Sequence, residues 1–379
     1  MSHKQRAVDD FSTVERELTE ISRWMYDNPE LGDAEFESSA RLAKFLGEHG
    51  FEVTYPTYGL STAFEANVGS SGPRVVICAE YDALPQVGHA CGHNIIATSS
   101  VGAGISLAGL ADELGIRVTV LGTPAEEGGG RKIDLIEAEA FEDAAASMLI
   151  HPSRHDLVDP KLLAAQGFVA TFHGKTAHAA ATPQLGINAL DAFVGAYNNI
   201  STLRQQFESG DRVHGVITEG GGAPNVIPDL TRSRWIVRAA TADRFDAIKQ
   251  KVLACFEAAA QSSGCRLEIE YEGEPYVDLI SNPVMTALFA ANCIALGRSM
   301  PTFADSGIET SASSDMGNVS HVVPSIHPSL AIETEAVNHQ PEFAAATVTP
   351  SGERALRDGA LAMAHTIIDM AEQDVWESL

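Results

Sequence analysis

The hexapeptide HACGHN, residues 89–94, places two histidines and one cysteine around a single glycine. Side chains of these types suit a structural zinc site, a cysteine nucleophile, or part of a catalytic metal site. A structural zinc site uses four ligands and is usually rich in thiolates. Because only one cysteine is present locally, the structural zinc site is the weakest of the three interpretations.

A cysteine nucleophile would require a reactive thiolate at Cys91, with His93 as its base. Acidic residues nearby would raise the pKa of the thiol and make the thiolate scarce. A mixed set of sulfur, nitrogen and oxygen donors, with carboxylates to spare, fits a catalytic metal site better. The composition of the segment therefore favours half of a catalytic metal centre.

Two adjacent glutamates, Glu126 and Glu127, follow an apolar run and precede three glycines. On an extended chain adjacent side chains point to opposite sides. We therefore expect one glutamate to bind a metal and the other to take a proton from a metal-bound water. Crowded carboxylates in a partly desolvated pocket would bring the pKa of such a base towards the working pH. A solvated acidic turn is the alternative interpretation.

Apolar segments that predict buried strands precede most of these residues. Residues 74–84, 117–127 and 144–152 each begin with an apolar run and end in polar side chains. The C-terminal ends of strands are where α/β sheets place their active sites. A lone histidine is more often structural, but six such residues favour one common site: Asp82, Cys91, His93, Glu126, Glu127 and His151.

The remaining pattern predicts two domains. A capping-box pattern, Ser12-x-x-Glu15, predicts the start of the first helix, and residues 35–49 predict a second. Strands at 168–173, 213–218, 232–240 and 266–271, with helices at 188–206 and 244–262, are typical of a split βαβ arrangement. We expect an α/β catalytic domain over 1–165 and 278–379, with a mostly parallel mixed sheet flanked by helices. A ferredoxin-like α+β domain over 166–277 would be inserted into it.

The composition restricts the partners. The chain of 379 residues carries 51 acidic and 25 basic residues, a net charge of −26. Such a surface repels phosphate backbones and anionic lipids, so we expect no binding to nucleic acid or membranes. Five scattered cysteines without a C-x-x-C pair argue against a disulfide framework. With no apolar stretch typical of a secretory signal, we expect a cytoplasmic protein.

Seven segments together resemble a known enzyme family. They are AEYDALPQVGHACGHN, GTPAEEGGG, the HP at 151–152, GKTAHAA, PNVIPD, SSDMGNVSHVVPSIHP and NHQPEF. In this order they are similar to two-metal amidohydrolases of the aminoacylase/carboxypeptidase superfamily, metallopeptidase family M20. The resemblance covers nearly the whole chain and is closest to the β-alanyl-lysine dipeptidase and p-aminobenzoyl-glutamate hydrolase branch. It implies hydrolysis of the C–N amide bond of an N-acyl amino acid, a dipeptide or an aminobenzoyl amino acid.

The resemblance also implies roles for individual residues. The ligands of two divalent ions, manganese or zinc first and cobalt or nickel as alternatives, would be Cys91, His93, Glu127, His151 and His339. Glu126 would be the general base that removes a proton from a metal-bridging water to give the attacking hydroxide, His178 would polarise the scissile carbonyl, and Asp82 would orient a ligand. Asn225 and Arg238 would hold the carbonyl and carboxylate of a small-molecule substrate. The inserted domain would act as a lid and a dimerisation domain, so we expect a homodimer or a higher homo-oligomer.

Two other functions are compatible with the same residues. A hydrolytic deaminase would release ammonia or an amine from an aromatic substrate at the same site. A non-catalytic, metal-dependent binding protein would have lost its base, although the presence of both Glu126 and Glu127 argues against this. Asn94 stands where many relatives carry aspartate, and we expect it to remove one charge beside the metals. His155 and His214 have open roles, and structural histidines are the simpler interpretation.

Overall fold

The computed structural model describes residues 1–308 and 312–379 and divides into two compact units. Unit 1 comprises Met1–Lys161 and the described residues from Leu279 onward, apart from Ala312–Ser314. Those three residues join Leu162–Asp278 in unit 2. Across the described ranges, no helix combines the length and the apolar character needed to cross a bilayer.

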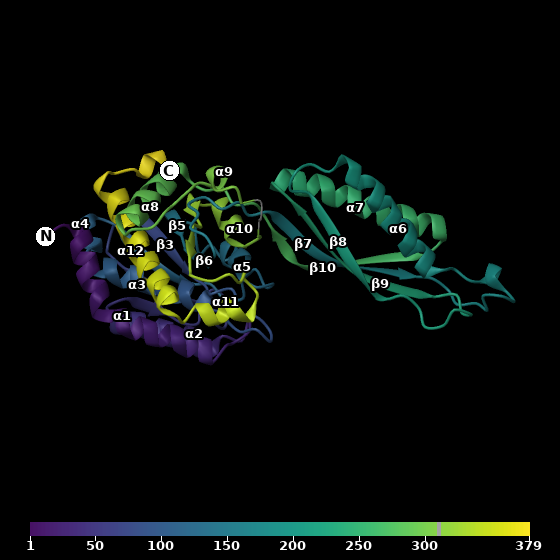
Figure 1. Ribbon diagram of the computed structural model, residues 1–379, viewed down its shortest axis with the longest axis horizontal. Helices are drawn as coiled ribbons and strands as arrows, with labels where there is room; N and C mark the ends of the chain where they lie inside the picture. Colours follow the sequence, from purple (N-terminus) through teal and green to yellow (C-terminus); the bar gives the residue numbers. More distant parts are fainter. Residues whose placement is uncertain (309–311) are drawn as a thin grey trace. The chain divides into compact units, whose positions relative to one another are not determined.

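Unit 1 is built on a six-stranded mixed sheet with the order β1-β2-β4-β3-β5-β11 (Figure 1). The strands are β1 (Glu52–Thr54), β2 (Phe64–Val68), β3 (Arg74–Ala79), β4 (Arg117–Gly122), β5 (Ala144–Met148) and β11 (Ser325–Ile326), with β6 (His151–Ser153) and β12 (Ser329–Ala331) forming a separate pair. β4, β3, β5 and β11 pair in parallel, whereas β1 and β2 pair antiparallel. Because parallel strands end at the same edge of a sheet, the segments that follow β3, β4 and β5 converge.

Helix α3 (His93–Ala108) is the central helix of unit 1. It is buried on all sides as far as Leu107, because it packs on β3 and β4 and is covered by α1 and α12. A helix that is apolar all round is typical of such a position. The other helices are α1 (His3–Asp27), α2 (Phe36–Glu48), α4 (Ala111–Leu114), α5 (Arg131–Glu137), α8 (Pro283–Ala295), α9 (Phe303–Ser306), α10 (Met316–Ser320), α11 (Pro341–Ala346), α12 (Pro350–Glu372) and the 3₁₀ turn η3 (Trp376–Ser378).

The first helix begins earlier than the capping-box pattern at Ser12 predicted. α1 starts at His3, and its cap is Ser2, whose Oγ accepts a hydrogen bond from the backbone nitrogen of Gln5. Ser12 lies inside the helix, and its hydroxyl donates to a backbone carbonyl one turn earlier. The prediction was wrong because the buried face starts before Ser12, with Ala7, Phe11, Val14 and Leu18 on one side of the helix.

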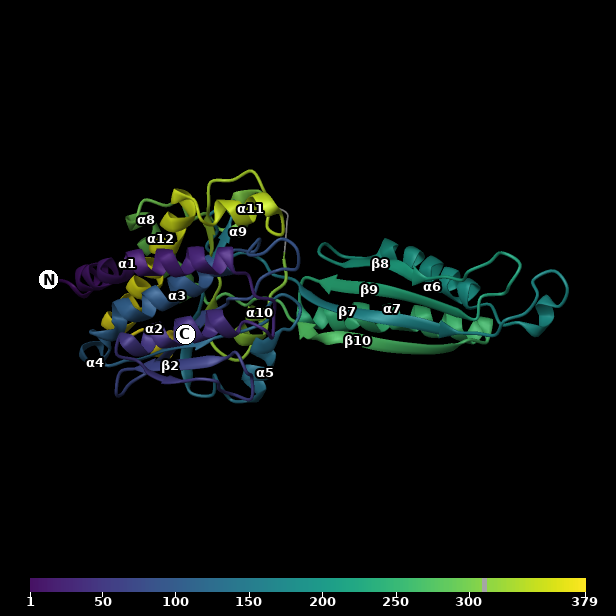
Figure 2. The same cartoon turned by 90° about the horizontal axis from the view of Figure 1, so that it is seen from below.

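Unit 2 is a four-stranded antiparallel sheet, in the order β10-β7-β9-β8, with α6 and α7 over one face (Figures 1 and 2). Its elements are β7 (Ala164–His173), η1 (Pro183–Leu185), α6 (Ala189–Leu203), η2 (Arg204–Gln206), β8 (Arg212–Glu219), β9 (Leu230–Ala239), α7 (Ala242–Ser263) and β10 (Arg266–Tyr276). Aromatic side chains of the sheet and helices form its core, among them Phe168, Trp235 and Phe256. A mixed sheet with helices and a ferredoxin-like unit together confirm the predicted fold class.

Candidate metal centre

Two groups of three potential metal ligands share the sulfur of Cys91. One group is Cys91, His93 and His151, the other is Cys91, Glu127 and His339, and within each the donor atoms lie within 4.8 Å of one another. The sulfur of Cys91 is 3.4 Å from Nε2 of His151, and Nε2 of His339 is 3.1 Å from Oε1 of Glu127. The fold thus brings together all five residues that the resemblance implied as ligands, in an arrangement suited to a pair of ions with one common donor.

Gly92 determines how closely two of these segments approach. It has a φ of 83° and precedes the first residue of α3, so it forms the turn between Cys91 and His93. A Cβ atom added to Gly92 would overlap the ring of Pro152, the residue after His151. Only glycine adopts this left-handed conformation freely and leaves room for such an approach. The glycine of HACGHN therefore allows His151 to lie against Cys91.

His339 reaches the site from a distant part of the sequence. Its backbone nitrogen donates to the carbonyl oxygen of Ala90 at 2.8 Å. The side chain of Asn338 donates to the carbonyl oxygens of Cys91 at 3.4 Å and Pro152 at 3.3 Å. These contacts attach the loop of His339 to the turn at Cys91 and to the residue after His151. The side chain of His339 nevertheless stays 55% exposed. Sequence reasoning did not identify Asn338, which lies beside His339 in the segment NHQPEF.

Asp82 is buried and contacts two of the candidate ligands with its two oxygens. Oδ1 lies 3.0 Å from Nδ1 of His93, and Oδ2 accepts a hydrogen bond from the backbone nitrogen of Glu127 at 2.9 Å. A hydrogen bond at Nδ1 fixes the tautomer and leaves the lone pair of Nε2 available. Nε2 of His93 is buried and has no hydrogen-bond partner among the described residues. This nitrogen, with a thiol and carboxylates around it, fits a divalent ion.

The two glutamates lie in a turn and converge, which corrects the expectation of an extended segment. β4 ends at Gly122, and Ala125 then adopts a φ of 49°. The following glycines let the chain fold back, with the backbone nitrogens of Gly129 and Gly130 donating to the carbonyl oxygen of Ala125. As a result, Oε2 of Glu126 and Oε1 of Glu127 both lie 4.0 Å from Nε2 of His93. The two side chains therefore do not point to opposite sides, as they would on an extended strand, and both approach the same histidine.

Burial and charge shift the acidities of these groups. Burial, with the carboxylates of Glu80 and Glu127, raises the pKa of Glu126 well above its ordinary value. Burial and Glu127 also raise the pKa of the Cys91 thiol, which disfavours a free thiolate nucleophile. Burial lowers the pKa of His151, so its imidazole stays neutral as a metal ligand must. A divalent cation here would favour the ionised forms of the thiol and the carboxylates.

Glu35 is a buried carboxylate that sequence reasoning did not identify. One oxygen accepts a hydrogen bond from the backbone nitrogen of Ala125 at 2.8 Å, and the other accepts from the hydroxyl of Thr62 at 3.0 Å. Burial raises the pKa of Glu35 to about 7 from an ordinary value of 4.5. Glu35 therefore holds Ala125, the residue with a positive φ at which the turn of Glu126 and Glu127 begins.

The replacement Glu35→Gln is expected to remove a pH dependence of stability. The unfolded chain releases this proton near pH 4.5 and the folded chain near pH 7, so unfolding becomes easier as pH rises between these values. The difference corresponds to about 3 kcal/mol. The free energy of unfolding of the metal-free protein can be measured by urea denaturation at pH 4.5 and pH 8. Between these two pH values it should fall by about this much more in the parent than in E35Q. Parallel pH profiles of the two proteins would contradict the assignment.

Asn94 does not face the candidate ligands. Its side-chain nitrogen donates to the hydroxyl oxygens of Ser22 at 3.0 Å and Thr347 at 3.2 Å. It therefore connects α3 to α1 and to the segment before α12. The expectation that Asn94 removes a charge beside the metals is not supported by this orientation.

His178 and Asn225 lie together in unit 2. The carbonyl oxygen of Asn225 accepts a hydrogen bond from the backbone nitrogen of Ala179 at 3.0 Å, and both side chains are exposed. Nδ1 of His178 accepts a hydrogen bond from the backbone nitrogen of Ala180 at 3.2 Å. A neutral ring in this contact carries its proton on Nε2, which can then donate to a substrate oxygen.

Arg238 lies apart from these two residues. It pairs with Ala165 near the end of β9, where the chain enters unit 2, and Nη1 donates to the hydroxyl of Ser313 at 2.7 Å. The segments with His178 and Asn225 lie next to the opposite end of β9, because Leu230 pairs with His173 and Val226 bridges His178. At about 3.3 Å per residue, the part of β9 between Leu230 and Arg238 is roughly 25 Å long. The structure therefore does not bring Arg238 together with the other two residues inside unit 2.

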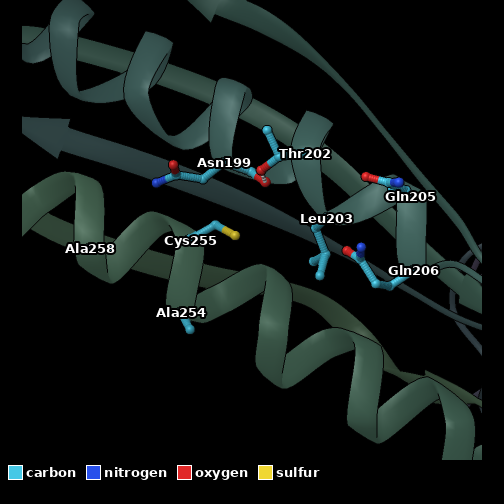
Figure 3. Close-up of a pocket in the computed structure, with 8 residues that line it drawn as sticks. All are labelled: Asn199, Thr202, Leu203, Gln205, Gln206, Ala254, Cys255 and Ala258. Carbon is cyan, nitrogen blue, oxygen red and sulfur yellow. Dashed lines mark hydrogen bonds between the residues drawn. The ribbon is translucent and has the colours of Figure 1, made fainter.

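Other features of the structure lie outside the ligand groups. A hollow of about 570 Å³ between α6 and α7 (Figure 3) is lined by Asn199, Thr202, Leu203, Gln205, Gln206, Ala254, Cys255 and Ala258. None of these was predicted as a site residue.

His155 and His214 are exposed, and neither belongs to the two ligand groups that share Cys91.

Comparison with known proteins assigns the family. Residues 164–263 match the M20 peptidase dimerisation domain. The chain is 37% identical to the Xaa-Arg dipeptidase of Mus musculus, over 97% of this chain and 88% of the mouse protein. The chain belongs to the M20 metallopeptidase family. It is also 30% identical to one of the subunits of the p-aminobenzoyl-glutamate hydrolase of Escherichia coli, over 72% of this chain and 61% of that protein.

A solved structure supports the M20 fold. The dinuclear metal-binding M20 peptidase of Bacillus subtilis has a TM-score of 0.72 to this chain at 21% identity, covering 94% of this chain and 99% of the other. The relatives are named as a dipeptidase, a hydrolase and a deacetylase. This M20 protein is therefore a metal-dependent hydrolase of amide bonds. The predicted family and enzyme class are thus confirmed, and the non-catalytic interpretation is set aside.

Proposed function

We propose that the protein hydrolyses the amide bond of a dipeptide whose C-terminal residue is cationic. The observation that carries the proposal is the pair of ligand groups sharing Cys91, with Glu126 4.0 Å from His93. The name of the mouse relative, Xaa-Arg dipeptidase, supports the substrate class. The net charge of −26 would also attract a cationic substrate.

In this proposal two divalent ions occupy the two ligand groups. Cys91, His93 and His151 would hold one ion, and Cys91, Glu127 and His339 would hold the other. Such ions supply polarisation of the scissile carbonyl and acidification of the attacking water. Sulfur and imidazole suit zinc, while imidazole with carboxylate also suits manganese, so these are the metals to test first.

The protein's own residues would handle the proton and the substrate. Glu126 takes a proton from the attacking water and returns it to the amine that leaves, for which a raised pKa is favourable. Asp82 keeps His93 and the backbone of Glu127 in place. From the lid, His178 donates Nε2–H to the carbonyl oxygen and Asn225 holds the same group, while Arg238 pairs with the substrate carboxylate.

We further propose that unit 1 is the catalytic domain and that unit 2 is the lid and dimerisation domain. Most of the length of β9, roughly 25 Å from Leu230 to Arg238, separates the segment of His178 from Arg238 within unit 2, whereas two extended residues span about 7 Å. One dipeptide therefore cannot contact both residues of the same chain, and a partner chain must supply one of them.

The edge strand β8 offers a surface for that partner. It exposes Val216 and Ile217, which are 62% and 46% exposed, and α6 adds the exposed Val194 and Tyr197. An unpaired apolar strand is usually covered in the native assembly. Light scattering is expected to give twice the chain mass of 40.2 kDa, and Val216→Lys to shift it towards one chain. A parent protein with the mass of one chain would contradict the dimer.

The function is tested by amine release from a substrate panel, using chelator-treated protein before and after reloading with Zn²⁺ or Mn²⁺. The panel pairs dipeptides ending in arginine or lysine with the same dipeptides amidated at the C-terminus or ending in leucine or glutamate. N-acetyl amino acids, p-aminobenzoyl-glutamate and an aromatic amine without an amide complete it. We expect metal-dependent hydrolysis with the highest kcat/KM for free, cationic C-termini. Turnover of the aromatic amine alone would overturn amide hydrolysis in favour of the deaminase alternative.

A further inference from the structure

A buried lysine lies beside the candidate metal centre, and the proposed mechanism does not use it. Nζ of Lys132 is 2.6 Å from Oε1 of Glu80 and 2.6 Å from Oδ1 of Asp315. All three side chains are buried. Burial disfavours the charged ammonium, but Asp315 and Glu80 outweigh it and hold the pKa of Lys132 well above its ordinary value. Lys132 is therefore a fixed internal cation in the first turn of α5.

The two carboxylates that bind Lys132 differ in their second oxygens. Oδ2 of Asp315 accepts a hydrogen bond from the backbone nitrogen of Lys132 at 3.1 Å, so both of its oxygens have partners. Oε2 of Glu80 is buried and has no hydrogen-bond partner among the described residues. A buried polar atom in this state is costly unless a ligand satisfies it.

The free oxygen of Glu80 faces a candidate ligand. Oε2 lies 3.6 Å from Nε2 of His93, the nitrogen that Asp82 leaves available by its contact with Nδ1. Two donors at about 2.1 Å from one ion are themselves separated by roughly 3 to 3.5 Å. Glu80 is also grouped with Glu126, the proposed base, through carboxylate oxygens within 4.8 Å of each other.

We propose that Lys132 positions Glu80 so that Oε2 serves the ion on the His93 side of the centre. Glu80 then adds a carboxylate that strengthens binding at this one of the two positions. Lys132 is a positioning residue that acts through Glu80, and its charge balances the extra carboxylate. The inference rests on the metal centre of the proposed function and extends it by a residue outside the predicted ligand set.

The test compares Glu80→Gln with Asp315→Asn. Each replacement removes one carboxylate charge from Lys132 and keeps an oxygen for its ammonium, but only E80Q changes the oxygen that faces His93. Calorimetric titration of the metal-free protein with Zn²⁺ or Mn²⁺ measures both positions, with circular dichroism as the control for folding. We expect E80Q, which removes a donor, to weaken one of two positions by more than the roughly 10–100-fold known for groups that only orient ligands, and D315N to weaken it by that much or less.

A third variant tests the action through Glu80. Lys132→Met is expected to weaken the same position, and the E80Q/K132M double variant should show no further loss, because both changes remove one interaction. The absorption bands of bound Co²⁺ provide an independent signature, since they respond to a changed ligand field and not to turnover. In E80Q the bands of one position should shift while those of the other stay constant.

Several results would overturn the inference. Parental affinity in E80Q would exclude a role for Oε2, and equal weakening by E80Q and D315N would show that only total charge matters. Uniform weakening at both positions would indicate general disruption. A parent protein that binds no divalent ion would overturn the metal centre itself, and this failure is distinguishable because it is seen before any variant is made.

Discussion

Glutamine in place of Glu126 is expected to lower kcat by about 10²–10⁴-fold or more, with little change in KM. Glutamine has nearly the same shape but cannot accept the proton of the attacking water. Glu126 is buried, and its Oε2 lies 4.0 Å from His93, so few other groups are placed to replace it. Steady-state kinetics with the best dipeptide of the panel measures the effect, alongside metal content by mass spectrometry.

The neighbouring glutamate provides the matched control. Glu127→Gln removes a charge at the next position, but Glu127 contacts His339 and is a proposed ligand. We expect E127Q to lose one ion per chain and to recover part of its activity when the metal concentration is raised. E126Q should keep both ions and show no such recovery. A kcat close to that of the parent in E126Q would contradict its assignment as the general base.

The variant Cys91→Ala is expected to lose both ions, whereas His151→Ala and His339→Ala should each lose one. The reason is that the sulfur of Cys91 belongs to both ligand groups, and each histidine belongs to only one. Removing a ligand should cost more than the roughly 10–100-fold known for groups that only orient ligands. The measurement is the ratio of metal to protein after dialysis.

Cys78→Ser is the control for this second prediction. Cys78 is also buried, but its sulfur lies 3.5 Å from the hydroxyl of Ser147 and belongs to no ligand group among the described residues. C78S should keep two ions per chain, which would show that loss in C91A is not a general effect of removing a buried thiol. If C91A retained two ions at parental affinity, the shared-donor arrangement would be wrong.

The local patterns of the sequence predicted the order and type of the main strands and helices of unit 2, although β7 begins four residues earlier and β10 ends five residues later than predicted. β7, β9 and the two helices alternate apolar and polar residues at the spacings typical of strands and helices, and the partners lie close in sequence. The start of α1 was missed because a local capping signal at Ser12 competes with a buried face that only the packed structure defines. Tertiary packing overrides such a local signal.

The sequence by itself determined which side chains were available for metal chemistry, because HACGHN and the glutamate pair are identifiable by type and position, while His339 was indicated only by the resemblance to the M20 family. The tertiary structure decided how they combine. In the folded chain Cys91 belongs to two ligand groups, and Glu126 and Glu127 both approach His93. Beside these groups lies a buried set of charges that the sequence did not indicate: Glu80, Lys132 and Asp315. Ion pairing and burial depend on segments far apart in the chain, and neither spacing nor composition records which charges meet away from water.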